Sequence, residues 1–407
     1  MMPRAGLLAL LGASVLLSAP ALAQNLSFEQ VSRGRELVTA GDCVACHTPE
    51  GAKPFSGGRA VETPFGNILT PNITPDRATG IGAWSDDEFV RAMQQGIGRN
   101  GEHLYPAFPY TAYTKIKRND LIAMRAYLNT LEPVSNAVDV NQLPFPFNMR
   151  FVMTFWNALF FTPGEFKDNP QKSAEWNRGA YLVEGLGHCA SCHTAKNALG
   201  GDETAMEGGN LQNWFAPNLT GDKRVGLGGW SADDLVDYLK TGHTAHTAAS
   251  GPMAEVIEFQ TSKMPDADLK AMAAYLKDIP PSPDKKPTPL AADDAAMKAG
   301  AAIYADNCSA CHVGSGEGLP KLFPALKGSA IVQSDDPTTL LRVILEGGRS
   351  VATDGAPTAP AMPAFDWKLS DAQTAAVATY VRNAWGNAAG AVDARSAASM
   401  RGALRQE

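Results

Sequence analysis

All six cysteines of this 407-residue chain belong to three copies of one short pattern. The copies read CVACH at 43–47, CASCH at 189–193 and CSACH at 308–312. Two thiols three residues apart, followed directly by a histidine, form the attachment signature of c-type haem. The thiols can form thioethers with the two vinyl groups on one porphyrin edge, and the histidine then falls under the iron. The pattern predicts three covalently bound haem c groups, attached through Cys43, Cys46, Cys189, Cys192, Cys308 and Cys311, with His47, His193 and His312 as proximal iron ligands.

Two other uses of paired cysteines fit the chain less well. A structural zinc site takes four ligands, usually two C-x-x-C pairs or one pair with two histidines, and the spacing leaves too few donors for three such sites. A thioredoxin-like redox pair would follow a strand in a βαβ pattern, and the sequence shows no such pattern.

The first 23 residues are organised like a secretory signal peptide. Arg4 supplies the positive start, residues 7–17 are mostly apolar, and the small-residue cleavage site ALA occupies 21–23. The mature chain is therefore expected to begin at Gln24. An uncleaved membrane anchor is the alternative, and the short apolar run followed by a cleavage site argues against it.

Composition limits the classes of partner. The formal net charge is −7, and 44% of the residues are hydrophobic against 19% charged. No run of lysine and arginine is dense enough to follow a phosphate backbone, so no nucleic acid is expected as a partner. After the signal peptide, no segment reaches the roughly 20 uncharged apolar residues that a membrane span requires.

A helical stretch precedes each cysteine pattern and carries a glycine at an equivalent place, namely Gly34, Gly179 or Gly300. Two helices that cross closely need a small residue at the crossing point, and glycine provides it. The three matched glycines therefore predict a close helix crossing in each repeat.

A proline follows each cysteine pattern at Pro71, Pro217 and Pro324. A backbone carbonyl near such a proline could accept a hydrogen bond from the Nδ1–H group of the proximal histidine, which would fix the tautomer and raise the basicity of the ring. The alternative for each position is an ordinary loop proline.

Two further helices are expected in each repeat. The middle helices begin after Ser85 and Ser231, which are suited to N-cap positions. The last helices have apolar residues at intervals of three and four, which indicates one buried face. They carry Tyr127, Tyr275 and Tyr380, expected where the first and last helices cross. No strand pattern is evident, so the predicted architecture is all-α, with three small domains in tandem, each wrapped on a haem.

The composition of the intervening segments divides the chain further. Residues 279–294 are Pro-rich and predict an extended spacer, whereas the longer segment between the first two repeats is aromatic and apolar, interrupted by Asn148, Arg150 and Asn157. We interpret the aromatic segment as packed on the first domain or facing a partner. The expected division is a signal peptide at 1–23, a first domain at 24–132, an aromatic connector at 133–172, a second domain at 173–280, a Pro-rich linker at 281–292, a third domain at 293–388 and a C-terminal tail at 389–407.

The segments LYPAFPY at 104–110, GPMAEVI at 251–257, MPAFDWKLSDAQ at 362–373 and TYVRNAWGN at 379–387, together with the three haem motifs, resemble the three-haem cytochrome c subunits of bacterial membrane-associated alcohol dehydrogenases. Similar subunits serve gluconate, sorbitol, fructose and aldehyde dehydrogenases. The resemblance covers nearly all of the mature chain and implies three class I cytochrome c-like domains. It also implies a periplasmic electron carrier, associated with the inner membrane, that takes electrons from a dehydrogenase subunit carrying PQQ or flavin and passes them to ubiquinone or a terminal oxidase.

A methionine sixth ligand would raise the potential of each iron and suit it to accept electrons from an organic cofactor. In the third domain the candidate is Met362. In the second domain the family motif favours Met253 over Met264, which lies directly before the last helix.

The first domain departs from this pattern because Phe108 stands where some relatives have a methionine. Relatives with phenylalanine there tend to carry a methionine where Met153 stands, so the resemblance points to Met153. The sequence leaves other possibilities open: Met124, Met93, Met149, His103 or an iron with no sixth protein ligand.

The chain shows no grouping of a nucleophile with a general base, so we expect no bond-making chemistry of its own. The main alternative is a multi-haem redox enzyme, such as a peroxidase, in which the first haem iron is open. The remaining histidines at 188, 243 and 246 are expected to face solvent, with a place near the haem edge as the alternative for His188, which directly precedes Cys189. The C-terminal tail is at most weakly amphipathic, so an interfacial anchor there is an open alternative.

Overall fold

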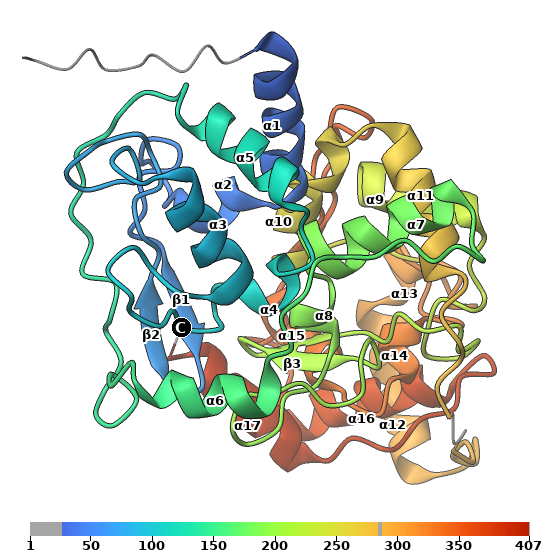
Figure 1. The fold of residues 1–407 in the computed structure, drawn as a ribbon. Helices are drawn as coiled ribbons and strands as arrows, with labels where there is room; N and C mark the ends of the chain where they lie inside the picture. Colours follow the sequence, from blue (N-terminus) through green and yellow to red (C-terminus); the bar gives the residue numbers. More distant parts are fainter. Residues whose placement is uncertain (1–26, 284–286, 407) are drawn as a thin grey trace, which may run out of the picture.

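The computed structural model describes residues 27–283 and 287–406. The expected signal peptide at 1–23 lies outside the described residues. Figure 1 shows three mainly helical units in chain order, the first in blue, the second in green and yellow, and the third in orange and red. The described parts of the expected linker, 281–283 and 287–292, lie in neither helix nor strand.

The three units share a first helix, a short helical turn at the cysteine pattern, a middle helix and a last helix, but the hairpin precedes the middle helix in the first two units and follows it in the third. The first contains α1 (Phe28–Ala40), α2 (Cys43–His47), β1 (Ala60–Thr63), β2 (Gly66–Leu69), α3 (Asp86–Gln95), α4 (Tyr110–Tyr113) and α5 (Arg118–Leu128). The connector contains α6 (Val152–Phe160). The second unit contains α7 (Ala174–Tyr181), the π-helical turn η1 (Leu182–Leu186), α8 (Ala190–His193), β3 (Gly209–Leu211), β4 (Trp214–Ala216), α9 (Ala232–Thr241), α10 (Pro252–Phe259), the 3₁₀ turn η2 (Thr261–Lys263) and α11 (Asp266–Leu276). The third contains α12 (Ala295–Asn307), α13 (Ser309–His312), α14 (Ala330–Gln333), α15 (Thr338–Glu346), β5 (Gly348–Arg349), β6 (Ala361–Met362), α16 (Asp371–Asn383) and α17 (Ala394–Leu404).

The first and last helices of each repeat cross at the predicted glycines, since α1 packs on α5, α7 on α11 and α12 on α16. A Cβ atom added to Gly179 would lie 1.9 Å from the backbone oxygen of Ala271, which leaves no room for a side chain. Gly34 and Gly300 are equally crowded by the facing helix. The matched tyrosines lie at the same crossings, because the Cβ atom of Tyr275 is 3.0 Å from that added atom.

The predicted N-caps of the middle helices are confirmed. Ser85 accepts a hydrogen bond from the backbone N–H of Glu88, whose carboxylate accepts one from the N–H of Ser85 in return. Ser231 and Asp234 form the same capping box at α9. Each such cap stabilises its helix by about 1 kcal/mol.

The expectation that the chain contains no strands is wrong for three short hairpins. β1 pairs with β2, β3 with β4, and β5 with β6, all antiparallel. Each strand has two to four residues, which is too short for an alternating hydrophobic pattern to be recognised in the sequence. The fold is therefore helix-rich, with one small hairpin in each unit.

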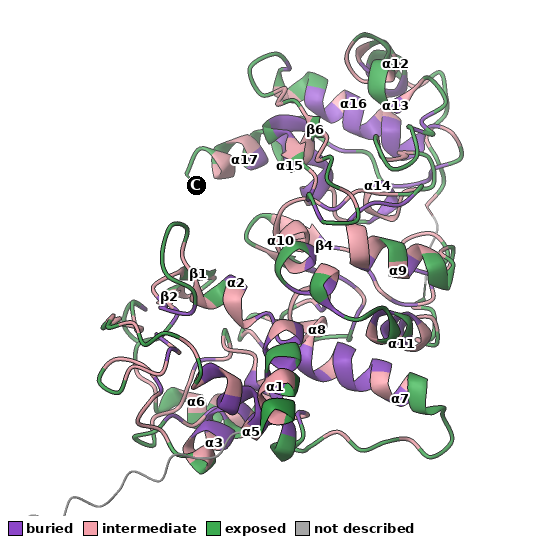
Figure 2. Cartoon of the chain, turned by 90° about the horizontal axis from the view of Figure 1, so that it is seen from above, coloured by how far each residue is buried: buried purple, intermediate pink, exposed green. Residues whose placement is uncertain are grey.

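The first two units share one hydrophobic core, and the third has its own. Figure 2 shows buried residues along α7, in the second unit, and along α16, in the third. The C-terminal helix α17 belongs to the third core, because Ala397 and Met400 are buried and Arg401 donates to Asp371 at 2.8 Å. The buried side chains of α17 are therefore used within the third unit.

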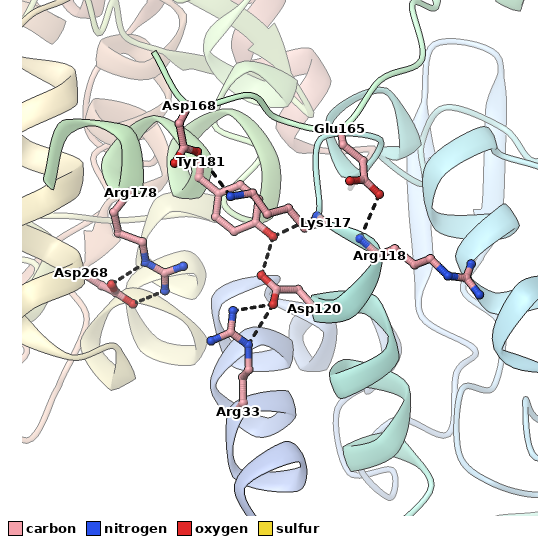
Figure 3. Close-up of polar contacts among 9 residues, drawn as sticks. All are labelled: Arg33, Lys117, Arg118, Asp120, Glu165, Asp168, Arg178, Tyr181 and Asp268. Atoms are coloured by element: carbon pink, nitrogen blue, oxygen red, sulfur yellow. Dashed lines mark hydrogen bonds and ion pairs between the residues drawn. The ribbon is translucent and has the colours of Figure 1, made fainter. Parts of the chain in front are cut away.

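A polar network joins the first two units (Figure 3). The carboxylate of Asp120 on α5 accepts hydrogen bonds from Arg33 on α1 and, at 2.7 Å, from the hydroxyl of Tyr181 on α7. The backbone N–H of Lys117 donates to the same tyrosine hydroxyl at 3.1 Å. Because Asp120 and Tyr181 are both buried, this network fixes how the two units lie against each other.

Among the described residues, no helix combines the length and apolar character that crossing a bilayer would need.

Candidate haem sites

The three cysteine patterns occupy equivalent places, in a short helical turn that follows the first helix of each unit. All six thiols are free of disulfide bonds. Burial raises the pKa of Cys43 and of Cys189 to about 12. Redox-active cysteines have lowered pKa values, so these thiols lack the character of a thioredoxin-like pair.

The proximal histidines make the predicted contact in every unit. The Nδ1–oxygen distances are 2.7 Å for His47 and Pro71, 2.6 Å for His193 and Pro217, and 2.9 Å for His312 and Pro324. A carbonyl oxygen has no proton, so Nδ1 must carry the hydrogen and donate it. The lone pair of each ring therefore lies on Nε2, which is the atom free to bind iron.

Burial also keeps these imidazoles neutral. It lowers the pKa of His47, His193 and His312, while the hydrogen bond to the proline carbonyl acts in the opposite direction. A neutral ring with its proton fixed on Nδ1 is the form that a metal ligand requires. The residues present therefore fit haem iron at all three places.

A second contact at each histidine was not predicted from the sequence. A glycine with positive φ donates its backbone N–H to the carbonyl oxygen of the proximal histidine. The pairs are Gly57 with His47 at 2.8 Å, Gly208 with His193 at 3.0 Å, and Gly318 with His312 at 3.1 Å.

The conformation of these glycines explains the residue type. Gly57 has φ of +74°, and an added Cβ atom would lie 2.4 Å from the carbonyl carbon of Pro71. Gly318 is crowded in the same way by the backbone of Phe323, at 2.3 Å. These glycines stand at different distances from their motifs along the chain, so no fixed spacing could reveal them.

Zinc remains a poor fit for the same residues. Within the described ranges 27–283 and 287–406, no three His, Cys, Asp or Glu side chains gather in a group that could hold a metal ion. Each unit instead offers one histidine and two thiols, which is the donor set of covalent haem attachment.

The candidate sixth ligands of the second and third units lie beside the buried cores. Met362 is half-buried in β6, which pairs with Gly348 and packs against the third core. Met253 is half-buried in the first turn of α10. Met264 is only 3% exposed and belongs to the shared core, which suits a packing residue.

In the first unit, Phe108 packs edge-on against Tyr113, with ring centroids 5.5 Å apart. Met93 and Met124 are fully enclosed in the core, whereas Met153 is half-buried in α6. Four residues further along α6, Asn157 accepts a hydrogen bond from Tyr110 at 2.6 Å. Residues four apart share a helix face, so Met153 lies on the side of α6 that faces the first unit.

Met149 and His103 are the other candidates for this ligand outside the core. Met149 is half-buried just before α6. His103 is held through Nε2 by the hydroxyl of Thr154 at 2.9 Å, and its Nδ1 atom is buried with no hydrogen-bond partner in the described chain.

The expectation that three other histidines face solvent is wrong for two of them. His188 lies between the first two units, edge-on against Tyr113 at 5.6 Å, and burial lowers its pKa to about 4. His243 is buried and lies 3.0 Å from the carbonyl oxygen of Val351 in the third unit. Only His246 is exposed. The errors arise from packing between units, which no single repeat encodes.

The first two attachment sites lie close to a common interface. Helix α10 of the second unit contacts α2 of the first. Gln260 donates to the carbonyl oxygen of Ala40 at 2.5 Å, and Arg59 pairs with Glu255 at 2.8 Å. Asp42 is buried here, and burial together with the charge of Glu255 raises its pKa to about 8. The first haem motif therefore packs against the helix that carries Met253.

The sequence of this chain is similar to those of known proteins over most of its length. A model of the cytochrome c family matches residues 31–132, 177–280 and 297–385. The chain is 41% identical to the gluconate 2-dehydrogenase cytochrome c subunit of Pantoea cypripedii, over 91% of this chain and 89% of that protein. It is 37% identical to the alcohol dehydrogenase (quinone) cytochrome c subunit of Gluconobacter oxydans, over 93% and 84%. It is also 36% identical to the fructose dehydrogenase cytochrome subunit of Gluconobacter japonicus, over 92% and 83%.

Proposed function

Because this chain belongs to the cytochrome c family and resembles its dehydrogenase-associated cytochrome subunits along nearly its whole length, we propose that it is the electron-transfer subunit of a dehydrogenase complex. It carries three covalently bound haem c groups. Electrons enter from a catalytic subunit that holds PQQ or flavin, and leave to ubiquinone or a terminal oxidase.

The observation that carries this proposal is the threefold recurrence of one ligand arrangement. Each unit presents two thiols and a histidine whose Nδ1–H group donates to a proline carbonyl. A single motif of this kind could arise by chance, but three copies with the same hydrogen bond indicate three sites of one kind.

Bound haem supplies reversible one-electron chemistry between Fe(II) and Fe(III). The residues of this chain hold and tune it. The proline carbonyls fix the histidine tautomer and strengthen its donor nitrogen, and Met253, Met362 and Met153 are proposed as sixth ligands that raise the potential. The glycines at 57, 208 and 318 hold the loop that follows each histidine close to it.

The arrangement of units favours transfer in sequence. The first motif packs against the second unit through the contact of α10 with α2, and a buried hydrogen bond joins Asp120 to Tyr181. His243 and Val351 join the second unit to the third. A rigid assembly of this kind keeps the distances between haems fixed, which stepwise electron transfer needs.

We place the protein in the periplasm, at the periplasmic face of the inner membrane. The proposal rests on the predicted signal peptide at 1–23 and on the likeness to the cytochrome c subunits of gluconate 2-dehydrogenase and alcohol dehydrogenase (quinone). We propose peripheral association with the membrane.

The test removes one haem ligand at a time. Replacement His312→Ala should abolish quinone-linked turnover of the complex, while dye-linked activity of the partner subunit persists. His246→Ala is a matched control, because that histidine is exposed and lies outside the three motifs. The relay would be contradicted if the alanine variants of His47, His193 and His312 all kept full quinone-linked turnover.

A further inference from the structure

The connector helix α6 presents two different faces. The half-buried residues Met153, Trp156, Asn157 and Phe160 recur at intervals of three and four and form the inner face. The outer face consists of large apolar side chains that are mostly exposed: Phe151 at 61%, Phe155 at 66% and Leu159 at 70%. A surface helix normally turns its apolar face toward the core, whereas α6 has its most apolar side facing outward.

The inner face is firmly held by both neighbouring units. The Trp156 indole N–H donates to the carbonyl oxygen of Leu199 in the second unit at 2.9 Å. Asn157 accepts the hydroxyl of Tyr110 in the first unit. The ring of Phe160 lies against Gly201, where an added Cβ atom would be only 2.4 Å away. Because these contacts fix the helix, the exposure of its outer face is a stable feature of the fold.

The connector that carries the outer face has almost no charge. Between residues 140 and 164 the only ionisable side chain is Arg150. Its guanidinium turns inward, donating to the carbonyl oxygen of His103 at 2.8 Å and lying 4.9 Å from the ring of Tyr105. Two other exposed apolar side chains are Phe145, at 77%, which belongs to the same connector, and Leu199, at 60%, whose carbonyl oxygen accepts the hydrogen bond of Trp156. We call Phe145, Phe151, Phe155, Leu159 and Leu199 the α6 patch.

The size of the α6 patch argues against a protein partner or a second copy of this chain. A nine-residue helix is about 14 Å long, so its outer face with the neighbouring side chains offers on the order of a few hundred Å². A stable protein interface buries about 800 Å² on each partner and includes a polar rim with hydrogen bonds. The α6 patch provides neither that area nor charged or hydrogen-bonding groups at its centre.

We propose that the α6 patch docks on a phospholipid bilayer, with α6 lying in the plane of the membrane interface. The inference deepens the proposed function and rests on it only for placing the protein at a membrane. A bilayer needs no complementary shape, and Phe and Leu on one face of a helix are side chains that enter the boundary between headgroups and acyl chains. Figure 1 shows α6 at the outer edge of the molecule, below the β1–β2 hairpin.

The contrast with α17 supports this choice of helix. The buried residues of α17, Ala397 and Met400, pack inside the third unit, so it has no apolar face to offer a membrane. In α6, by contrast, the large apolar residues Phe155 and Leu159 are exposed. The α6 patch is thus the apolar helix face that remains available.

The experiment uses the mature holoprotein and vesicles of phosphatidylethanolamine and phosphatidylglycerol, separated by flotation. We expect the wild type to float with vesicles, and to do so equally at high salt because the contact is apolar. The double variant F151S/F155S should partition at least about tenfold less into vesicles. The control F28S/W367S also replaces two exposed aromatic residues, at 86% and 79% exposure, and should bind as the wild type does.

Two further measurements on each variant separate the possible outcomes. The haem absorption spectrum and reduction by a soluble donor report on the electron carrier and do not depend on vesicles, so a failed carrier is distinguished from a failed membrane site. The docking proposal is overturned if the wild type does not bind vesicles, or if F151S/F155S binds them as tightly as the wild type. It is also overturned if F151S/F155S keeps full vesicle binding but loses co-purification with a dehydrogenase subunit or changes oligomeric state.

Discussion

The hydroxyl of Tyr181 in the second unit donates to the carboxylate of Asp120 in the first, with 2.7 Å between the oxygens (Figure 3). Asp120 is only 4% exposed, and its other carboxylate oxygen is held by Arg33. The Tyr181 hydroxyl also accepts the backbone N–H of Lys117. The Tyr181 hydroxyl therefore makes hydrogen bonds to two groups of the first unit, a carboxylate oxygen and a backbone N–H, and lies at the centre of the contact between the two units.

Tyr181→Phe should destabilise the protein by roughly 1–3 kcal/mol, because it leaves a buried carboxylate oxygen and a backbone N–H without this partner. Denaturant unfolding followed by circular dichroism measures the loss. Tyr127→Phe is the matched control, since the hydroxyl of Tyr127 makes no hydrogen bond among the described residues, and it should change stability little. Equal effects of the two substitutions would show that the contact contributes nothing specific.

Gly179→Ala should destabilise the second unit by at least about 1–3 kcal/mol, because the new methyl group would overlap the backbone of Ala271 in the facing helix. Thermal unfolding and the yield of haem-loaded protein both report this effect. Gly402→Ala provides the control within the same chain. It lies in α17 with no atom within 4 Å of the added Cβ, and alanine should stabilise that helix by about 0.5–1 kcal/mol. A tolerated Gly179→Ala would mean that the helices can separate at little cost.

The repeated features were predictable because local chemistry fixes them. The haem motifs, the crossing glycines and the Ser85 and Ser231 caps each follow from a few neighbouring residues. The contacts between proximal histidines and proline carbonyls were also predicted, since a neutral ring with a fixed tautomer needs an acceptor. In these cases three copies of the same pattern supported one another.

The features that were missed depend on distant parts of the chain. His188 is half-buried and His243 is buried because units pack together, and that packing has no signature within a single repeat. The hairpins are too short for a periodic pattern. The glycines at 57, 208 and 318 were hidden because the loops that carry them differ in length.

Asp42 should make stability depend on pH. Burial and Glu255 raise the pKa of Asp42 to about 8, well above its value in the unfolded chain. Between about pH 4 and pH 8 the folded protein therefore holds a proton that the unfolded chain has lost, so stability falls as the pH rises through this range. Asp42→Asn removes the titrating group. The fall in the free energy of unfolding over three pH units should therefore be smaller in the variant, by on the order of 2–4 kcal/mol.

Unfolding free energies of the wild type and Asp42→Asn, measured in denaturant at several pH values, test the dependence on Asp42. Glu50→Gln is the control, because Glu50 is an exposed carboxylate near the same haem motif. Parallel pH profiles for the wild type and Asp42→Asn would contradict the burial of an uncharged Asp42.

Met153→Leu should change the first haem alone. If Met153 is the sixth ligand, the variant loses about one third of the near-infrared methionine–iron charge-transfer intensity expected from three such haems, and the potential of one haem falls. Met124→Leu is the control, because Met124 is fully buried in the core and the substitution conserves volume, so all of the charge-transfer intensity should remain.

If Met149→Leu loses the band and Met153→Leu keeps it, the sixth ligand is Met149 and not Met153. A wild type with only two methionine-bound haems would point to His103 or an open iron, and an open iron would favour a redox enzyme over a pure carrier. The location of Met153 on the inner face of α6, where Asn157 meets Tyr110, is what leads us to expect the first outcome.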